Sequence, residues 1–151
     1  MTELEIIAAL SERNVVALTL FGEVRNEPIE GIVAVACVIR NRVRTQYRGQ
    51  TYRQCCLAPW QFSCWKVEGG KANHEALMIL ARELVGGQTP KDRAFAECDY
   101  VAQGVLSDTF RDRVGRCRHY HTSAMKPRPE WAIGKTPAYE VSSHLFYEGV
   151  A

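Results

Sequence analysis

This sequence of 151 residues lacks the features that mark several special classes of protein. No stretch reaches the roughly 18 consecutive apolar residues of a membrane-spanning helix. Lys and Arg exceed Asp and Glu by only 19 to 17, well short of the basic excess of a dedicated nucleic-acid binder. No internal repeat or low-complexity tract divides the chain. We therefore expect one globular domain over residues 1–151, monomeric, with no stable membrane insertion and no nucleic-acid partner.

A secretory signal and a cysteine-based metal motif are also missing. The first residues are acidic where a signal peptide is basic, so we expect synthesis in the cytoplasm. No C-x-x-C pair of a zinc ribbon or thioredoxin-like site is present. A cytoplasmic origin favours free, partly buried thiols over disulfides. The cysteines are Cys37, Cys55, Cys56, Cys64, Cys98 and Cys117.

Capping signals and apolar spacing predict a mainly helical first half. Thr2 and Glu5 have the spacing of a capping box, and Ser11 can restart the helix. Residues 15–21 are apolar and continue towards Pro28, which forces a break near residue 26 or 27. A new helix starting at Pro28 is apolar on nearly every face over residues 32–43. That helix should form the centre of the core.

The second half predicts fewer and shorter elements. Residues 45–70 indicate an ordered loop region with a short strand. Asn73 is the expected N-cap of a helix ending at residues 86–87, and another helix is expected over residues 93–103. Segments 117–122 and 144–147 have β-like patterns. The predicted fold class is α+β, mainly helical with a small β- and loop-rich part.

Glu23 is the first candidate for chemistry. It follows an apolar helical run and a glycine, directly before the predicted break. A carboxyl group against apolar walls has a raised pKa and can act as a general acid, as cleavage of a glycosidic bond requires. Taken alone, a solvated glutamate at a helix end is the plainer interpretation. For Glu27 and Glu30, capping or pairing with Arg25 is favoured over catalysis.

His119 and His121 lie two residues apart and would face the same side of a strand, with Cys117 extending the series. That face could bind zinc, but the spacing is not a standard zinc signature, and a polar groove lining is the favoured interpretation. Tyr120 would point the opposite way, towards core or cleft.

Aromatic residues gather in the predicted loops and short strands rather than along a helix. Rings beside amide and hydroxyl groups such as Gln61 and Ser63 suit a carbohydrate cleft, although filling the core explains any single ring equally well. The set comprises Trp60, Phe62, Trp65, Tyr120, Trp131, Phe146 and Tyr147.

Several segments, in order, resemble the SleB-type cell-wall hydrolases. Residues 18–31, LTLFGEVRNEPIEG, with AVA at 34–36 and NRV at 41–43, resemble the opening motif of that family. QFS at 61–63, the YH of 120–121, Pro129 with Trp131, and HLFY at 144–147 resemble its later motifs. The resemblance covers residues 14–148, nearly the whole chain.

The resemblance implies a lysozyme-like domain with a glycan cleft, in a family of spore-cortex lytic enzymes and of phage or bacterial wall hydrolases. It implies bacterial peptidoglycan as substrate, Glu23 as the catalytic residue, and no metal or organic cofactor. Substrate contacts are expected from Gln61, Phe62, Ser63, Tyr120, His121 and Trp131, with support from Arg25, Glu27, His144 and Tyr147.

The reaction that the resemblance favours is that of a lytic transglycosylase, which leaves 1,6-anhydro-muramoyl ends. A muramidase is the alternative within the same chemistry, with Glu23 activating water. A zinc amidase or peptidase and a non-catalytic wall-binding or virion domain are the rivals outside it. Without a signal, the chain would reach the wall through phage-mediated release or packaging in a virion.

Overall fold

The first two helices begin at the side-chain caps that the sequence predicts. In the computed structural model, which describes residues 1–151, helix α1 (Glu3–Ala9) starts at a capping box between Thr2 and Glu5. Helix α2 (Glu12–Val24) starts at Ser11, whose hydroxyl accepts a hydrogen bond from the backbone of Asn14. These local signals are confirmed because each one satisfies a free N–H group of the first helical turn.

Helix α3 (Ile29–Arg44) forms the centre of the core, as its apolar sequence predicts. It begins directly after Pro28, which separates it from α2, and is buried along most of its length. Its last turn carries Arg42 and Arg44, which complement the negative end of the helix dipole. Helix α6 (Arg93–Leu106) packs against both α2 and α3. Together these three helices form most of the apolar core.

Residues 45–70 form helical turns where the sequence predicted a loop region with a strand. Helix α4 (Tyr52–Leu57) is capped by Thr51, and the 3-10 turns η1 (Ser63–Trp65) and η2 (Val67–Gly69) follow. The strand prediction was wrong. The apolar side chains of this segment are buried against α2 and α3 through single turns, which require no strand partner.

Helix α5 (Lys71–Val85) starts earlier than predicted. Gly70 precedes it with a φ of 128°, a backbone conformation that favours glycine, so Asn73 lies inside the first turn and is not the N-cap. The side chain of Asn73 instead donates to the carbonyl oxygen of Gly22 at 2.9 Å. The predicted end at residues 86–87 is confirmed.

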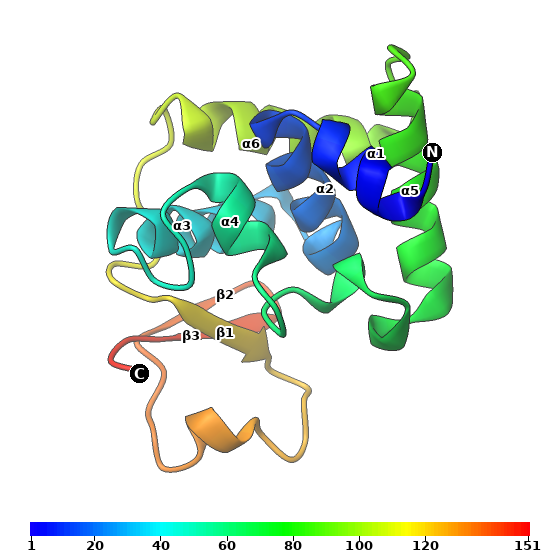
Figure 1. Cartoon of the computed structure of the whole chain (residues 1–151). Helices are drawn as coiled ribbons and strands as arrows, with labels where there is room; N and C mark the ends of the chain where they lie inside the picture. Colours follow the sequence, from blue (N-terminus) through cyan, green and yellow to red (C-terminus); the bar gives the residue numbers. More distant parts are fainter.

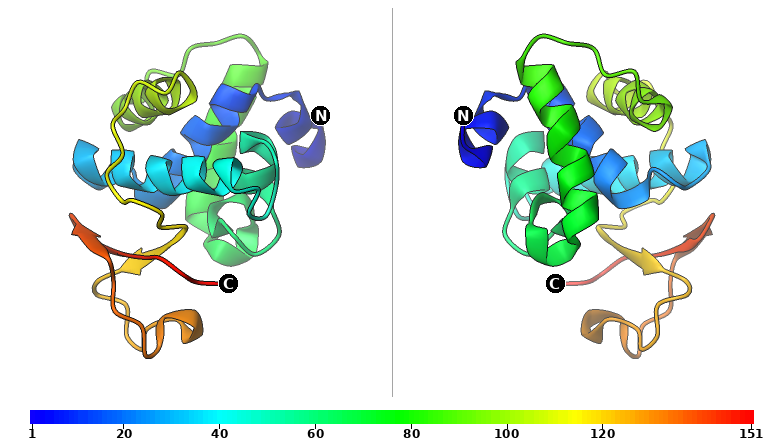
Figure 2. Two further views of the ribbon diagram at one scale, coloured as in Figure 1. Left: turned by 90° about the vertical axis from the view of Figure 1, so that its left-hand side faces the viewer. Right: turned by 90° about the vertical axis from the view of Figure 1, so that its right-hand side faces the viewer.

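The remaining chain forms a small antiparallel sheet, ordered β1-β3-β2. Strands β1 (His119–Thr122) and β3 (His144–Tyr147) lie within the two predicted segments, whereas β2 (Tyr139–Val141) was not predicted. The 3-10 turn η3 (Glu130–Ala132) lies in the connection from β1 to β2. The sheet and η3 lie on one side of the helices in all three ribbon views (Figures 1 and 2). The α+β class is thus confirmed.

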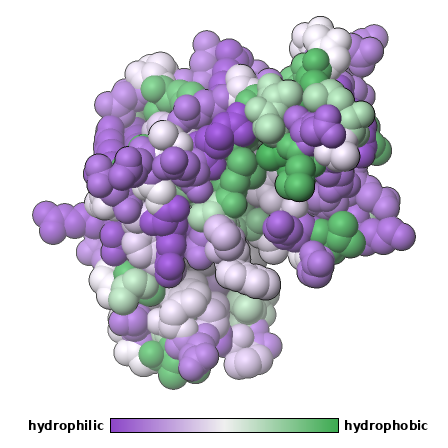
Figure 3. Space-filling model, viewed as in Figure 1, coloured by the Kyte–Doolittle hydropathy of each residue, from purple (hydrophilic) through white to green (hydrophobic).

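The surface is polar over most of the face drawn in Figure 3, and apolar side chains gather over α1 and α5, where Leu4 and Ile79 are exposed. No helix combines the length and apolar character that crossing a membrane requires. Inside the protein all six cysteines are buried and free, which confirms the thiol prediction.

Candidate active site

A groove of about 570 Å³ runs between the helices and the sheet. It brings together most of the site residues predicted from the sequence, although they come from α2, the loop before η1, β1, η3 and β3. Arg25, Glu27 and Tyr147 do not line it. The lining residues are Glu23, Arg42, Arg48, Trp60, Gln61, Phe62, Ser63, His119, Tyr120, His121, Thr122, Met125, Pro129, Trp131, His144, Val150 and Ala151.

Glu23 is held at the groove by close packing of α2 against η1. It occupies the second-last position of α2, next to Gly22. A Cβ atom on Gly22 would lie 2.4 Å from Cβ of Cys64, so only glycine permits this approach. The contact places the backbone N–H of Cys64 3.4 Å from Oε2 of Glu23. Gly22 is therefore needed for packing, because it lets Cys64 approach α2, and Glu23 beside it supplies the chemical group.

The environment of Glu23 favours its protonated form. Burial raises the pKa of Glu23, and this effect exceeds the opposing hydrogen bonds from Tyr120 and Cys64 and the opposing positive charge of Arg42. The Tyr120 hydroxyl donates to Oε1 of Glu23 at 3.1 Å. Burial and the charge of Glu23 raise the pKa of Tyr120 well above its usual value, so the phenol keeps its proton. A carboxyl group in this setting can give up a proton and take one back near neutral pH.

Arg42 supports the floor of the groove and was not singled out from the sequence. Its guanidinium is buried, donates to Gln61 Oε1 at 3.1 Å and to the carbonyl oxygen of Arg118 at 2.9 Å, and lies 5.1 Å from the centre of the Phe62 ring. A signal for it exists in the sequence. Arginine inside an otherwise apolar helix is seldom buried unless it has a specific partner.

The loop before η1 forms one wall of the groove. Phe62 is buried, Ser63 is exposed, and Gln61 is oriented by Arg42. Trp60 is 98% exposed with a φ of 65°, so its ring stands free at the lip of the groove. The groove lining therefore includes the residues of this segment for which substrate contact was predicted.

The opposite wall carries a cluster of rings. Trp131 lies 5.0 Å from the His119 ring and 5.3 Å from the Tyr147 ring. His121 donates from Nδ1 to the Thr122 carbonyl oxygen, and its Nε2 is hydrogen-bonded to the Tyr147 hydroxyl at 2.8 Å. Tyr147 therefore supports His121 from behind rather than lining the groove.

The residues do not assemble the zinc site considered from the sequence. His119 and His121 share one face of β1, as predicted, but no three His, Cys, Asp or Glu side chains come together to hold a metal ion. Both nitrogens of His121 already have protein partners. Nε2 of His119 is hydrogen-bonded to the Tyr47 hydroxyl at 3.0 Å.

Glu30 lies in the first turn of α3, where the capping alternative placed it, but neither Glu27 nor Glu30 pairs with Arg25. Arg25 turns back along α2 to the Phe21 carbonyl oxygen and the Asn73 side chain. Glu30 forms an ion pair with Arg113. The reason is geometric: α2 ends before these glutamates, so they lie on the turn and helix that follow and face other elements.

Glu27 instead anchors the sheet to the helices. Its Oε1 accepts from the backbone N–H of Ser143 at 3.0 Å and from His144 Nδ1 at 2.9 Å. The His144 ring, in turn, packs edge-on against Tyr120 at 5.3 Å. Glu27 is thus linked to the groove through His144 and Tyr120, and its supporting role stays a prediction.

Comparison with known proteins shows the family of this chain. A family model described as Cell Wall Hydrolase matches residues 26–147. The matched segment contains Arg42, the loop with Gln61, and strands β1 and β3, and it begins just after Glu23. No curated protein and no solved structure matches the chain.

Proposed function

This chain belongs to the cell wall hydrolase family, whose members degrade peptidoglycan, and from that premise we propose the bond that it cleaves. The proposed target is the glycan strand, at the glycosidic bond from N-acetylmuramic acid to N-acetylglucosamine. The proposed reaction is that of a lytic transglycosylase, with Glu23 as acid and then base.

One observation carries this proposal: Glu23 has the only acidic side chain among the residues that line the groove. Inverting glycosidases use a second carboxylate to activate water, and retaining ones use it as a nucleophile. The next carboxylate along the chain, Glu27, is already bound to Ser143 and His144. A single carboxyl group fits a reaction in which the substrate supplies its own nucleophile.

The mechanism requires only one proton to move out and back. Protonated Glu23 donates to the glycosidic oxygen, the bond to C1 of the muramoyl residue breaks, and positive charge develops on that ring. Glu23, now ionised, takes the proton of the muramoyl 6-hydroxyl, whose oxygen bonds to C1. The products are a 1,6-anhydro-muramoyl end and a free 4-hydroxyl group, and no water is consumed.

Tyr120 and Arg42 assist Glu23 in this scheme. Both favour the ionised form, so they limit the rise of its pKa and stabilise the carboxylate formed after proton donation. Gln61, Phe62, Ser63, His121 and Trp131 are proposed to contact the sugars.

The alternatives differ in what the structure offers them. A muramidase uses the same groove with water in place of the 6-hydroxyl, so only its products distinguish it. A zinc amidase or peptidase lacks a ligand set here. The lysozyme-like architecture, the monomeric state and the phage-mediated route to the wall stay predictions.

Digestion of purified peptidoglycan in heavy-oxygen water, followed by mass spectrometry, tests the proposal. The wild type should give muramoyl ends lighter by one water and free of heavy oxygen, and Glu23→Gln should give none. Glu30→Gln, which alters an exposed carboxylate paired with Arg113, is the control and should retain activity. Reducing ends that carry heavy oxygen would establish a muramidase, and wild-type activity in Glu23→Gln would reject the assignment of Glu23.

A further inference from the structure

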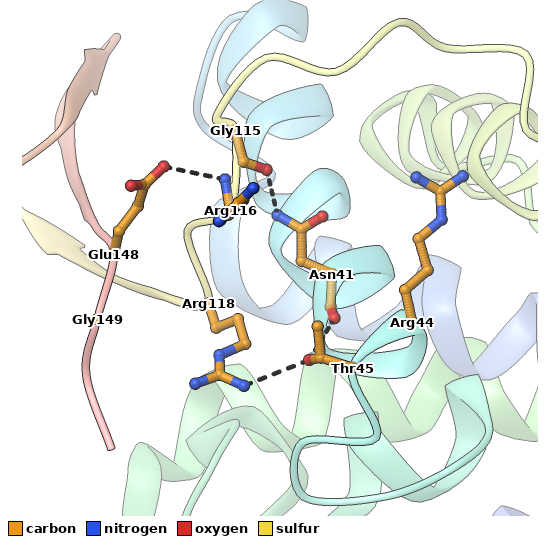
Figure 4. A pocket seen from close by; sticks show the side chains of 8 residues that line it. All are labelled: Asn41, Arg44, Thr45, Gly115, Arg116, Arg118, Glu148 and Gly149. Carbon is orange, nitrogen blue, oxygen red and sulfur yellow. Dashed lines mark hydrogen bonds between the residues drawn. The ribbon is translucent and has the colours of Figure 1, made fainter.

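Two hollows on this protein are lined by arginines, and their charges are balanced differently. One is a cavity of about 670 Å³ beside the end of α3, with Arg44, Arg116 and Arg118 in its wall (Figure 4). Asp108 pairs with Arg44, and Glu148 adds a negative charge to the same wall. The second hollow is one end of the groove, where Arg42 and Arg48 line the wall and Glu23 has the only acidic side chain.

Arg42 and Arg48 of the groove and Arg118 of the neighbouring cavity lie around one ring, that of Tyr47. Arg42, Arg48 and Arg118 lie 5.6, 4.9 and 4.3 Å from the centre of the Tyr47 ring. We call these four residues the arginine cluster. None of its arginines forms an ion pair with a carboxylate. The one acidic side chain of the groove, Glu23, is favoured in its protonated form, so an anionic ligand that neutralises these positive charges would be stabilised.

The pKa of the neighbouring His119 is affected by these positive charges. Its Nε2 is hydrogen-bonded to the Tyr47 hydroxyl, and the ring lines the groove. Burial, followed by the charges of Arg42, Arg118 and Arg48, lowers the pKa of His119 to about 4. No acidic group opposes these charges at His119, so the histidine stays neutral beside the three arginines.

The turn after α3 presents Arg48 to solvent at the groove. Gln46 and Arg48 have φ values of 54° and 67°, which bring Tyr47 back against the end of α3. Arg48 is exposed, and its only protein hydrogen bond goes to the Tyr47 hydroxyl. Most of its N–H donors are therefore free to bind a ligand.

We propose that the arginine cluster binds a carboxylate on the lactyl arm of the muramoyl residue, so that the protein selects anionic glycan strands. The inference rests on the proposed function, which puts a muramoyl sugar in the groove. The sugar backbone of such a strand is uncharged. The lactyl arm carries a carboxylate either directly, where the peptide has been removed, or on the stem peptide, and guanidinium groups bind carboxylates through charge-assisted hydrogen bonds.

Binding to inactive protein tests this without relying on turnover. In a Glu23→Gln background, calorimetry would compare Arg48→Glu with Arg48→Lys and with Arg82→Glu. Arg82 is an exposed residue of α5 that does not line the groove, so its reversal is a control for net charge. Three soluble strand preparations are needed: peptide-bearing, enzymatically denuded of peptide, and peptide-bearing with its carboxyl groups amidated.

Arg48→Glu should weaken binding of peptide-bearing strands by about tenfold, whereas Arg48→Lys and Arg82→Glu should change it by less than about threefold. Amidated strands should bind weakly to every variant. Denuded strands that bind as well as peptide-bearing ones show that the cluster accepts the lactyl carboxylate as well as a carboxylate of the stem peptide; weak binding of denuded strands identifies the stem-peptide carboxylate as the ligand. Equal affinity for peptide-bearing and amidated strands, or an equal loss in Arg82→Glu, would overturn the proposal. A failure of glycan cleavage would overturn the proposed function and leave this binding result unaffected.

Discussion

The Tyr120 hydroxyl donates to Oε1 of Glu23 across 3.1 Å, joining the end of α2 to strand β1 over 97 positions of sequence. Burial raises the pKa of both groups, so the phenol acts only as a donor and the carboxyl group is poised to hold a proton. This one contact fixes where the acid of the groove lies and opposes the rise of its pKa.

Removing that donor should shift the pH dependence of activity. In Tyr120→Phe the ionised form of Glu23 loses a hydrogen bond, so its pKa rises further. Activity falls on the alkaline side as the acid form is lost, and this limb should therefore move to higher pH. Looser placement of Glu23 should also lower the maximal rate by about tenfold or more.

Profiles of kcat/KM against pH for the wild type and Tyr120→Phe measure both effects. Tyr100→Phe, in which the hydroxyl of an exposed α6 residue is removed, serves as the control and should match the wild type. An alkaline limb that stays in place, or moves to lower pH, would contradict the assigned role of Tyr120.

Ionisation of Glu23 should lower the free energy of unfolding. Its pKa is raised in the folded state, so the folded protein binds the proton more tightly than the unfolded chain does. Below the unfolded pKa, about 4.3, both states are protonated and no penalty exists; the penalty grows as pH rises from the unfolded to the folded pKa and is complete above the folded pKa. Glu23→Gln lacks this titration and should melt higher than the wild type at neutral pH, with the difference shrinking towards pH 4. Thermal melts across pH test this, and a difference that grows on acidification would refute it.

Substitution at Gly22 should disturb both packing and catalysis. A Cβ atom there would lie 2.4 Å from Cβ and 2.7 Å from Sγ of Cys64. Gly22→Ala must push η1 away from α2, at a cost of about 1–3 kcal/mol, and should lower activity by displacing the Cys64 N–H from Glu23. Urea unfolding and wall digestion measure the two effects. Gly86→Ala, where the nearest atom is 3.3 Å away, should be mild by comparison.

Arg42→Met should break the hydrogen bonds that join α3 to Gln61 and Arg118 beside the groove. The substitution leaves Gln61 Oε1 and the Arg118 carbonyl oxygen without their donor, at a cost of about 1–3 kcal/mol in unfolding free energy. It also removes a positive charge that lowers the pKa of Glu23, so the alkaline limb should move upwards. Unfolding curves and pH profiles measure these effects, with Arg82→Met as the surface control. Wild-type stability together with an unmoved limb would show that Arg42 plays no part.

The elements that the sequence predicted correctly are those specified by neighbouring residues. Thr2, Ser11 and Pro28 act on the turn beside them, so their helices begin where the pattern indicates. Strand β2 was missed because Tyr139–Val141 gains its conformation by pairing with β3, and three residues carry no pattern of their own. Asn73 was misassigned because its side chain is used by Gly22 and Arg25, residues that are distant in sequence.

The candidate site shows the same division. Glu23 was identified by local context, as a carboxylate at the end of an apolar helix. The arrangement of Arg42, Tyr47 and His119 depends on hydrogen bonds from α3 and the turn after it to residues 118 and 119, which lie 76 and 72 positions away, so no local pattern contains it. Zinc was considered for His119 because sequence spacing shows which side chains share one face of a strand. The spacing does not show which residues lie opposite that face, and here Tyr47 is hydrogen-bonded to His119.

Burial of the six thiols affects how the protein responds to a change from reducing to oxidising conditions. Burial raises the pKa of every one, to about 12 for Cys56, Cys98 and Cys117. Disulfide exchange and oxidation proceed through the thiolate, which is scarce at such values. The folded protein therefore passes from a reducing to an oxidising solution without forming or needing a covalent crosslink, and its melting temperature should be the same in dithiothreitol as in oxidised glutathione.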